Sequence, residues 1–139
     1  MLIGNVHFDF GSKTYIMGIL NLSLDSFSGD GLGNNMELVL KTALEMEKFG
    51  ANVIDLGAES TRRVNNKVRS SQLNYDEEIN ALIPVIRALR SVITVPLSVD
   101  TYKPLVAQRC LEEGVNIINN IFRPNNPANS PTRISKWFS

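Results

Sequence analysis

Polar side chains follow four short apolar runs of this sequence, each close to the point where a run ends. Asn21 comes after the first run, and Thr61 and Arg62 come soon after the second. Asp100 follows the third run, and Asn119 lies in the fourth. In parallel α/β folds, functional groups gather at the carboxyl ends of the strands. Carboxylates and amides pair with the N–H and N atoms of a polar ring, whereas arginine, hydroxyls and a divalent cation hold anions. The pattern predicts a site for a polar heterocycle that carries phosphates.

Each of these residues also has a purely structural interpretation. Asn21 can shape a turn by bonding its own backbone, and Asp100 can cap a following helix. Arg62 and Arg63 can form a solvated pair in a loop, which contributes little energy. Asn119 is the hardest to explain in this way, because a buried amide without a partner costs about 1–3 kcal/mol. We therefore expect Asn119 to bond to protein or ligand.

The elements that must position these side chains are short apolar strands alternating with helices. We expect a β-hairpin first, with one arm at residues 6–10, a turn at 11–13 and a second run at 15–20. Strands without polar alternation, separated by helices, indicate a parallel sheet that is covered on its faces. Pro84 predicts a kinked or shortened second helix. The expected strands lie at 15–20, 52–56, 95–99 and 116–121. The expected helices run from a cap at Asn34 or Asn35 to about 49, from 75 to 90, and from 101–104 to Gly114.

Composition narrows the class of protein. The 139 residues contain 14 Lys and Arg against 14 Asp and Glu. This balance argues against binding to nucleic acid or to a membrane surface, and no apolar run is long enough for a membrane span. The single cysteine, Cys110, fits a reducing compartment, so we expect a cytoplasmic protein with a small-molecule partner. We interpret Cys110 as a small buried hydrophobe and His7 as a surface residue. With one cysteine and one histidine, zinc sites and Cys–His catalysis are not expected.

Three stretches together resemble the dihydropteroate synthase family. They are residues 16–28 (IMGILNLSLDSFS), 50–62 (GANVIDLGAESTR) and 98–104 (SVDTYKP), the last continuing to Gly114 and 117–119 (IIN). They occur in the order and at about the spacing of the family, and the resemblance covers residues 1 to about 121. It implies a (β/α)8 barrel, of which this chain holds the N-terminal portion. That portion has about four parallel strands with intervening helices and is preceded by a β-hairpin.

The resemblance also implies a reaction and a set of roles. The family joins p-aminobenzoate to 6-hydroxymethyl-7,8-dihydropterin pyrophosphate, which gives 7,8-dihydropteroate and pyrophosphate in folate biosynthesis. By position, Asn21 matches the Mg²⁺ ligand, and Asp100 and Asn119 match ligands of the pterin ring. Thr61 and Arg62 match loop residues that meet the pyrophosphate and p-aminobenzoate.

Phe27 matches the aromatic residue of the first loop that closes over p-aminobenzoate. Beyond Phe27 and Arg62 as loop candidates, the resemblance assigns no catalytic residue.

The chain departs from the family pattern mainly in two loops. Leu24 stands where the family usually has proline, and the carboxylate of Gly29-Asp30 is moved by one residue. Arg63-Val64 replaces the usual Pro-Gly, and Asn120 replaces an aspartate in the fourth strand. The resemblance therefore implies that the floor of the pterin site is retained, while the loops that organise catalysis are altered.

The length of the chain suggests two segments and several functions. We expect a partial pterin-binding barrel at residues 1–121 and a loosely ordered Pro/Asn/Ser-rich tail at 122–139. A barrel of this type needs roughly 200 residues or more, so the first hypothesis is a truncated synthase that is inactive alone. Alternatives are a non-catalytic pterin-binding half, a decayed fragment, or a methyltransferase that uses a methylated pterin. The partial barrel would need a homodimer or a completing second chain.

Overall fold

The computed structural model describes residues 1–22, 36–58, 63–64, 67–68 and 74–120. For 63–64 and 67–68 only the backbone is described. The elements of these ranges follow one another in the order β1 (Leu2–Ile3), β2 (Val6–His7), β3 (Met17–Asn21), α1 (Met36–Lys48), β4 (Val53–Gly57), β5 (Arg63–Val64), β6 (Lys67–Val68), α2 (Tyr75–Arg90), β7 (Leu97–Asp100), α3 (Pro104–Glu112) and β8 (Ile117–Asn119).

The central feature is a four-stranded sheet in the order β3-β4-β7-β8. All three pairings are parallel. Within this sheet, each strand lies beside the strand of the sheet that comes next along the chain. This arrangement, with a helix between successive strands β3–β4, β4–β7 and β7–β8, is that of a (β/α)8 barrel rather than a doubly wound sheet, whose strand order reverses. The predicted parallel α/β fold, the N-terminal portion of a barrel, is confirmed.

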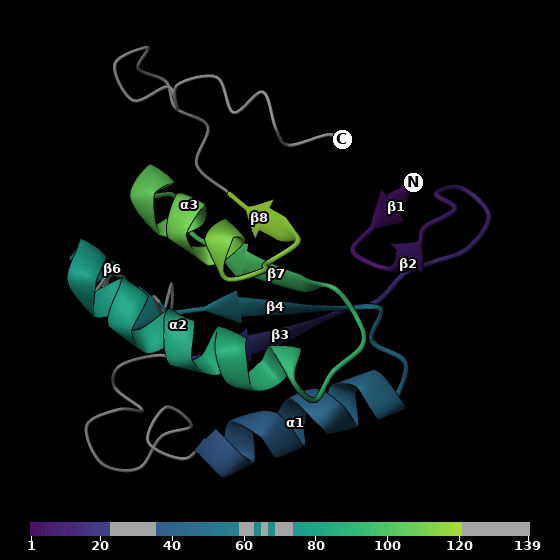
Figure 1. Cartoon of the computed structure of the whole chain (residues 1–139), viewed down its shortest axis with the longest axis horizontal. Helices are drawn as coiled ribbons and strands as arrows, with labels where there is room; N and C mark the ends of the chain where they lie inside the picture. The colour runs from purple at the N-terminus through teal and green to yellow at the C-terminus, as the bar shows by residue number, and fades with distance from the viewer. Residues whose placement is uncertain (23–35, 59–62, 65–66, 69–73, 121–139) are drawn as a thin grey trace.

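One face of the sheet is the apolar core. Because side chains alternate along a strand, Leu20, Leu56 and Val99 point to the same face, and all three are buried. The three helices cover that face with buried residues such as Val39 of α1 and Leu82 of α2. Figure 1 shows α1, α2 and α3 following one another in the order of the strands. The opposite face carries residues 17, 19 and 21 of β3 and their partners.

Helix α2 has the expected bounds and continues through Pro84, so of the two effects expected at this proline, a kink or a shortening, the helix does not show the shortening. A proline inside a helix costs about 3 kcal/mol. Ile83 and Val85 flank it and are both buried, as is Ile86. Burying each such side chain contributes roughly 1.5–3 kcal/mol, which outweighs the lost hydrogen bond. A capping box starts the helix: Asn74 accepts from the backbone N–H of Glu77, whose carboxylate accepts from that of Asn74.

Helix α3 begins at Pro104, where the missing N–H costs least, and its N-cap residue is Lys103. Asp100 ends β7 and is not the cap, so the structural alternative for Asp100 is wrong. None of the helices in the described ranges is long and apolar enough to cross a membrane.

The N-terminal hairpin differs from the prediction. Its arms are β1 and β2, which pair antiparallel around Gly4, a residue with a φ of +58°. The run at 15–20 instead provides β3, the first strand of the parallel sheet. Alternation at Phe8 and Phe10 reflects aromatic packing on Tyr15 rather than pairing with that run.

Between β4 and α2, strand β5 pairs antiparallel with β6. The expected cap of α1 at 34 or 35 and the tail at 122–139 lie outside the described residues.

Candidate functional site

Three of the predicted site residues lie in one row across the parallel sheet. The strand register pairs Asn21 with Gly57, Gly57 with Asp100, and Asp100 with Asn119. All four positions belong to the face opposite the helices and to the carboxyl ends of their strands. The structure thus brings Asn21, Asp100 and Asn119 together, as the sequence predicted.

Gly57 leaves room for the first member of this row. A Cβ atom built on Gly57 would lie 3.2 Å from Oδ1 of Asn21, closer than most real contacts of this kind. Any larger residue would therefore press on the Asn21 amide. Glycine at the end of β4 therefore leaves space for the Asn21 side chain.

Backbone hydrogen bonds fix the ends of the strands that carry the row. The N–H of Leu22 donates to the carbonyl of Gly57 at 2.7 Å, and the N–H of Thr101 donates to the carbonyl of Asn119 at 3.1 Å. Thr101 is 4% exposed. The residues that follow Asn21 and Asp100 are therefore hydrogen-bonded to the neighbouring strands. These bonds fix the backbone that carries the row.

Asp55 is a functional candidate that the sequence reasoning missed. It lies one row below, in register with Ile19 and Ser98, and is 4% exposed. Its Oδ2 accepts a hydrogen bond from Nδ2 of Asn119 at 3.2 Å, across the intervening strand β7. The sequence did contain a sign of this role. Asp55 lies inside the apolar run of β4, where a buried carboxylate needs a hydrogen-bond partner just as the amide of Asn119 does.

Two buried polar atoms of this lower row have no hydrogen-bond partner in the part of the chain that the structure describes. They are Oδ1 of Asp55 and Oγ of Ser98. Ser98 is fully buried, and the register places it beside Asp55. Leaving such groups unpaired costs free energy. The face of the sheet opposite the helices could therefore form hydrogen bonds to one more polar group.

Several predicted residues lie outside the described ranges. These are Phe27, Thr61 and Arg62, and the altered loop positions Leu24 and Gly29-Asp30. Of Arg63-Val64 only the backbone is described, as β5. Within the described ranges, no three His, Cys, Asp or Glu side chains form a cluster that could hold a metal ion.

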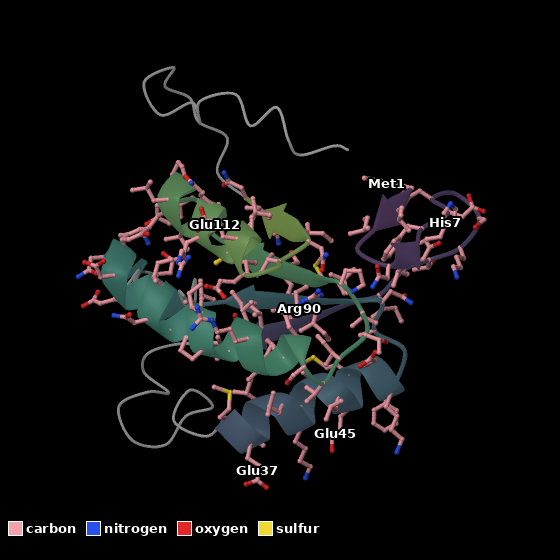
Figure 2. The ribbon with its side chains drawn as sticks, in the orientation of Figure 1. Met1, His7, Glu37, Glu45, Arg90 and Glu112 are labelled. Carbon is pink, nitrogen blue, oxygen red and sulfur yellow. The ribbon has the colours of Figure 1, made fainter. Side chains whose placement is uncertain are left out.

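The two residues interpreted as non-functional are placed as predicted. His7 is exposed, and Figure 2 shows it on the N-terminal hairpin, apart from the four-stranded sheet. Cys110 is fully buried. Burial, followed by the nearby charges of Glu78 and Glu113, raises the pKa of Cys110 to about 12. A thiol with so high a pKa is a poor nucleophile.

Comparison with known proteins decides the family. The sequence model of the family described as pterin binding enzyme matches residues 17–132. This segment includes every strand of the parallel sheet. The chain belongs to the pterin-binding enzyme family. The dihydropteroate synthase of Clostridium beijerinckii is 43% identical over 122 residues, which are 88% of this chain and 44% of that protein.

Solved structures of dihydropteroate synthases have the same fold. The enzyme from Clostridium difficile, crystallised in the presence of pteroic acid, superimposes with a TM-score of 0.73 at 44% identity, over 84% of this chain and 42% of that one. The enzyme from Xanthomonas albilineans with 4-aminobenzoic acid gives a TM-score of 0.70 at 33% identity, over 85% and 42%. The chain thus spans less than half the length of these pterin-binding relatives.

Proposed function

We propose that this chain supplies the pterin-binding half of a dihydropteroate synthase. The observation that carries the proposal is the row formed by Asn21, Gly57, Asp100 and Asn119, with Asp55 beneath it. The similar enzymes are synthases, which favours this reaction over methyl transfer. We propose a cytoplasmic location, with which the buried free thiol of Cys110 agrees.

The row would bind the pterin ring through complementary polar groups. The carboxylate of Asp100 can accept two N–H groups of the ring, and the amide of Asn119 offers both a donor and an acceptor. Because Asp55 accepts from Nδ2 of Asn119, the amide oxygen of Asn119 is directed away from Asp55. Asp55 therefore orients Asn119, and its Oδ1, which has no partner among the described residues, is available to a ring N–H or to a bridging water.

The reaction then needs little covalent chemistry from the protein. The amine nitrogen of p-aminobenzoate attacks the methylene carbon on the pterin ring, and the C–O bond to pyrophosphate breaks. Pyrophosphate leaves with the bonding electron pair, and the amine loses a proton. We assign Thr61 and Arg62 to the pyrophosphate and p-aminobenzoate, and Phe27 to covering the latter. Positioning and stabilisation of the leaving charge are the main contributions.

The amide oxygen of Asn21 is suited to be a magnesium ligand. Mg²⁺ keeps several waters and takes only one or two protein oxygens, so a single exposed amide oxygen beside Gly57 suffices. When bound, Mg²⁺ would neutralise the charge that develops on the leaving pyrophosphate. Asn21 itself would hold the ion at the carboxyl end of β3.

Turnover would require more than these four strands, because a barrel of this class has eight. We propose that the remaining strands come from a following segment, a second copy or another chain. The alternative function, pterin binding without catalysis, differs in one outcome: it predicts binding of the pterin substrate without release of pyrophosphate, even when the rest of the barrel is supplied.

The test is calorimetric binding of 6-hydroxymethyl-7,8-dihydropterin pyrophosphate with Mg²⁺. We compare Asp100→Asn with Asp76→Asn, a matched change at an exposed position of α2. Loss of a charged hydrogen-bond partner contributes about 1.5–3 kcal/mol, so we expect Asp100→Asn to weaken binding at least about tenfold. Asp76→Asn should bind as the wild type does. Equal affinity in both variants, or no binding by the folded wild type, would refute the proposal.

A further inference from the structure

A buried ion pair joins the start of helix α2 to the start of helix α3. Nζ of Lys103 lies 2.6 Å from Oε2 of Glu78, and the two side chains are 18% and 2% exposed. Glu78 belongs to the first turn of α2, and Lys103 is the N-cap residue of α3. Both therefore lie at the end of the sheet where Asp100 and Asn119 are found.

Lysine is a poor choice for this position on local grounds. An N-cap side chain normally accepts a hydrogen bond from the helix, and that of Lys103 makes no cap bond. The N-terminus of a helix also carries partial positive charge, which disfavours a cation. Its contact with Glu78, and its place 4.7 Å from the ring centroid of Tyr102, offset these penalties.

The pair is connected to both candidate pterin ligands through a short chain of hydrogen bonds. The backbone N–H of Lys103 donates to Oγ1 of Thr101 at 3.3 Å. The N–H of Thr101 donates to the carbonyl of Asn119 at 3.1 Å. Asp100 directly precedes Thr101, so the segment that Lys103 anchors begins at one ligand and bonds to the other.

We propose that the Glu78–Lys103 pair positions Asp100 and Asn119 for the pterin ring, an inference that rests on the proposed function. Glu78 holds the segment 101–103 against α2, and this segment fixes the ends of β7 and β8. Glu78 and Lys103 are positioning residues in this account. Their effect reaches the ring through Asp100 and Asn119.

A second ion pair joins the same two helical units at their other ends and serves as the matched control. Nε and Nη2 of Arg87 donate to the two carboxylate oxygens of Glu113 at 2.8 and 2.7 Å. Arg87 lies in the last turn of α2, and Glu113 follows α3. Helices α2 and α3 contact each other directly, as Figure 1 shows, yet this pair has no hydrogen bond to the row of site residues.

The test replaces each pair by two methionines. Glu78→Met with Lys103→Met removes both charges and keeps the volume, and such replacements of buried pairs often retain stability. Arg87→Met with Glu113→Met is the control. Two properties are measured in each folded protein: the exchange rate of the Thr101 amide relative to that of Val99, and the affinity for 6-hydroxymethyl-7,8-dihydropterin pyrophosphate with Mg²⁺.

We expect the Glu78/Lys103 variant to exchange Thr101 faster and to bind the pterin about 10- to 100-fold more weakly, the size of loss seen at metal sites when a residue that orients the ligating side chains is replaced. The control should match the wild type in both. Wild-type exchange and affinity in the Glu78/Lys103 variant would show that the pair is only structural. If the wild type itself does not bind, the proposed function fails, and the exchange of Thr101 still decides the positioning claim.

Discussion

Helices α2 and α3 are joined by one ion pair at each end, and the two pairs differ in almost every physical property. The side chains of Glu78 and Lys103, at the carboxyl ends of the strands, are 2% and 18% exposed. At the opposite end, that of Arg87 is 62% exposed and that of Glu113 is 14% exposed. A buried pair is costly to desolvate and seldom adds stability over an apolar pair. Such a pair therefore calls for an explanation other than stability, and its bonded connection to Asp100 and Asn119 provides one.

The same contrast extends to the sheet itself. Its helix-facing side consists of apolar side chains such as Leu20, Ile54 and Val99, which are fully buried. The opposite side carries Asp55, Asp100 and Asn119 and includes two buried atoms without partners among the described residues. One side is optimised for packing, and the other keeps polar groups at a cost in stability. This division is typical of barrels whose function lies at the carboxyl ends of their strands.

The largest expected effect comes from breaking the buried pair on one side only. Lys103→Met leaves the carboxylate of Glu78 without its cation in a buried environment, and this should destabilise the protein by about 3–5 kcal/mol. Glu78→Met should cost less, because the ammonium of Lys103 is partly exposed and can turn toward water. Urea denaturation of both variants measures the difference. A larger loss from Glu78→Met would contradict the assigned burial.

An intermediate effect is expected on the face of the sheet opposite the helices, where a substitution should stabilise the protein rather than destabilise it. Ser98→Ala removes a buried hydroxyl that has no partner in the described structure, and an unsatisfied group of this kind costs about 1–3 kcal/mol. We therefore expect the variant to unfold at a higher urea concentration while binding the pterin more weakly. The control is Ser91→Ala at the end of α2, an exposed serine whose Oγ donates to the carbonyl of Ala88, so that stability should fall slightly. Destabilisation by Ser98→Ala would indicate a bonded hydroxyl.

The smallest effect is expected at the Arg87–Glu113 pair, whose arginine is exposed, and the effect depends on pH. The hydrogen bond from Arg87 lowers the pKa of Glu113, and the charges of Arg87 and Arg109 lower it further against the opposing effect of burial. The pair's contribution is therefore complete above the unfolded pKa of about 4.3. It is lost as the pH falls through the lower pKa of the folded state.

Thermal unfolding of the wild type and Glu113→Gln from about pH 7 down to about pH 2 checks this, because the range crosses the unfolded pKa and continues into acid. The two melting temperatures should differ at neutral pH and converge in acid. Added salt should reduce the neutral-pH difference, because exposed pairs are screened. A difference that persists at the lowest pH would contradict the account.

Sequence patterns were sufficient for the regular elements that pack on one another. The second helix was expected at 75–90, where α2 lies, and its residues Leu82, Ile86 and Leu89, which recur at helical spacing, are buried. The four apolar runs became the four parallel strands, and the resemblance placed Asn21, Asp100 and Asn119 where the register now joins them. Hydrophobic periodicity works here because each element has one face in a single core.

The errors have physical causes of a different kind. Alternation along residues 6–10 shows which side chains share a face, and it does not identify the partner strand. Glu78 was overlooked because charged residues on a helix usually face solvent, and only the fold reveals that Lys103 meets it. Asp55 was overlooked although it lies between Ile54 and Leu56, where a carboxylate needs a bonded partner as much as Asn119 does.

The central claim is that the row of Asn21, Gly57, Asp100 and Asn119 forms the floor for a pterin ring. A crystal structure of the chain with 6-hydroxymethyl-7,8-dihydropterin pyrophosphate and Mg²⁺ tests it most directly. The account predicts that the ring lies on the helix-free face of the sheet, with Asp100 accepting ring N–H groups at about 2.7–3.2 Å. A ring bound away from this row, with Asp100 and Asn119 contacting only protein, would contradict it.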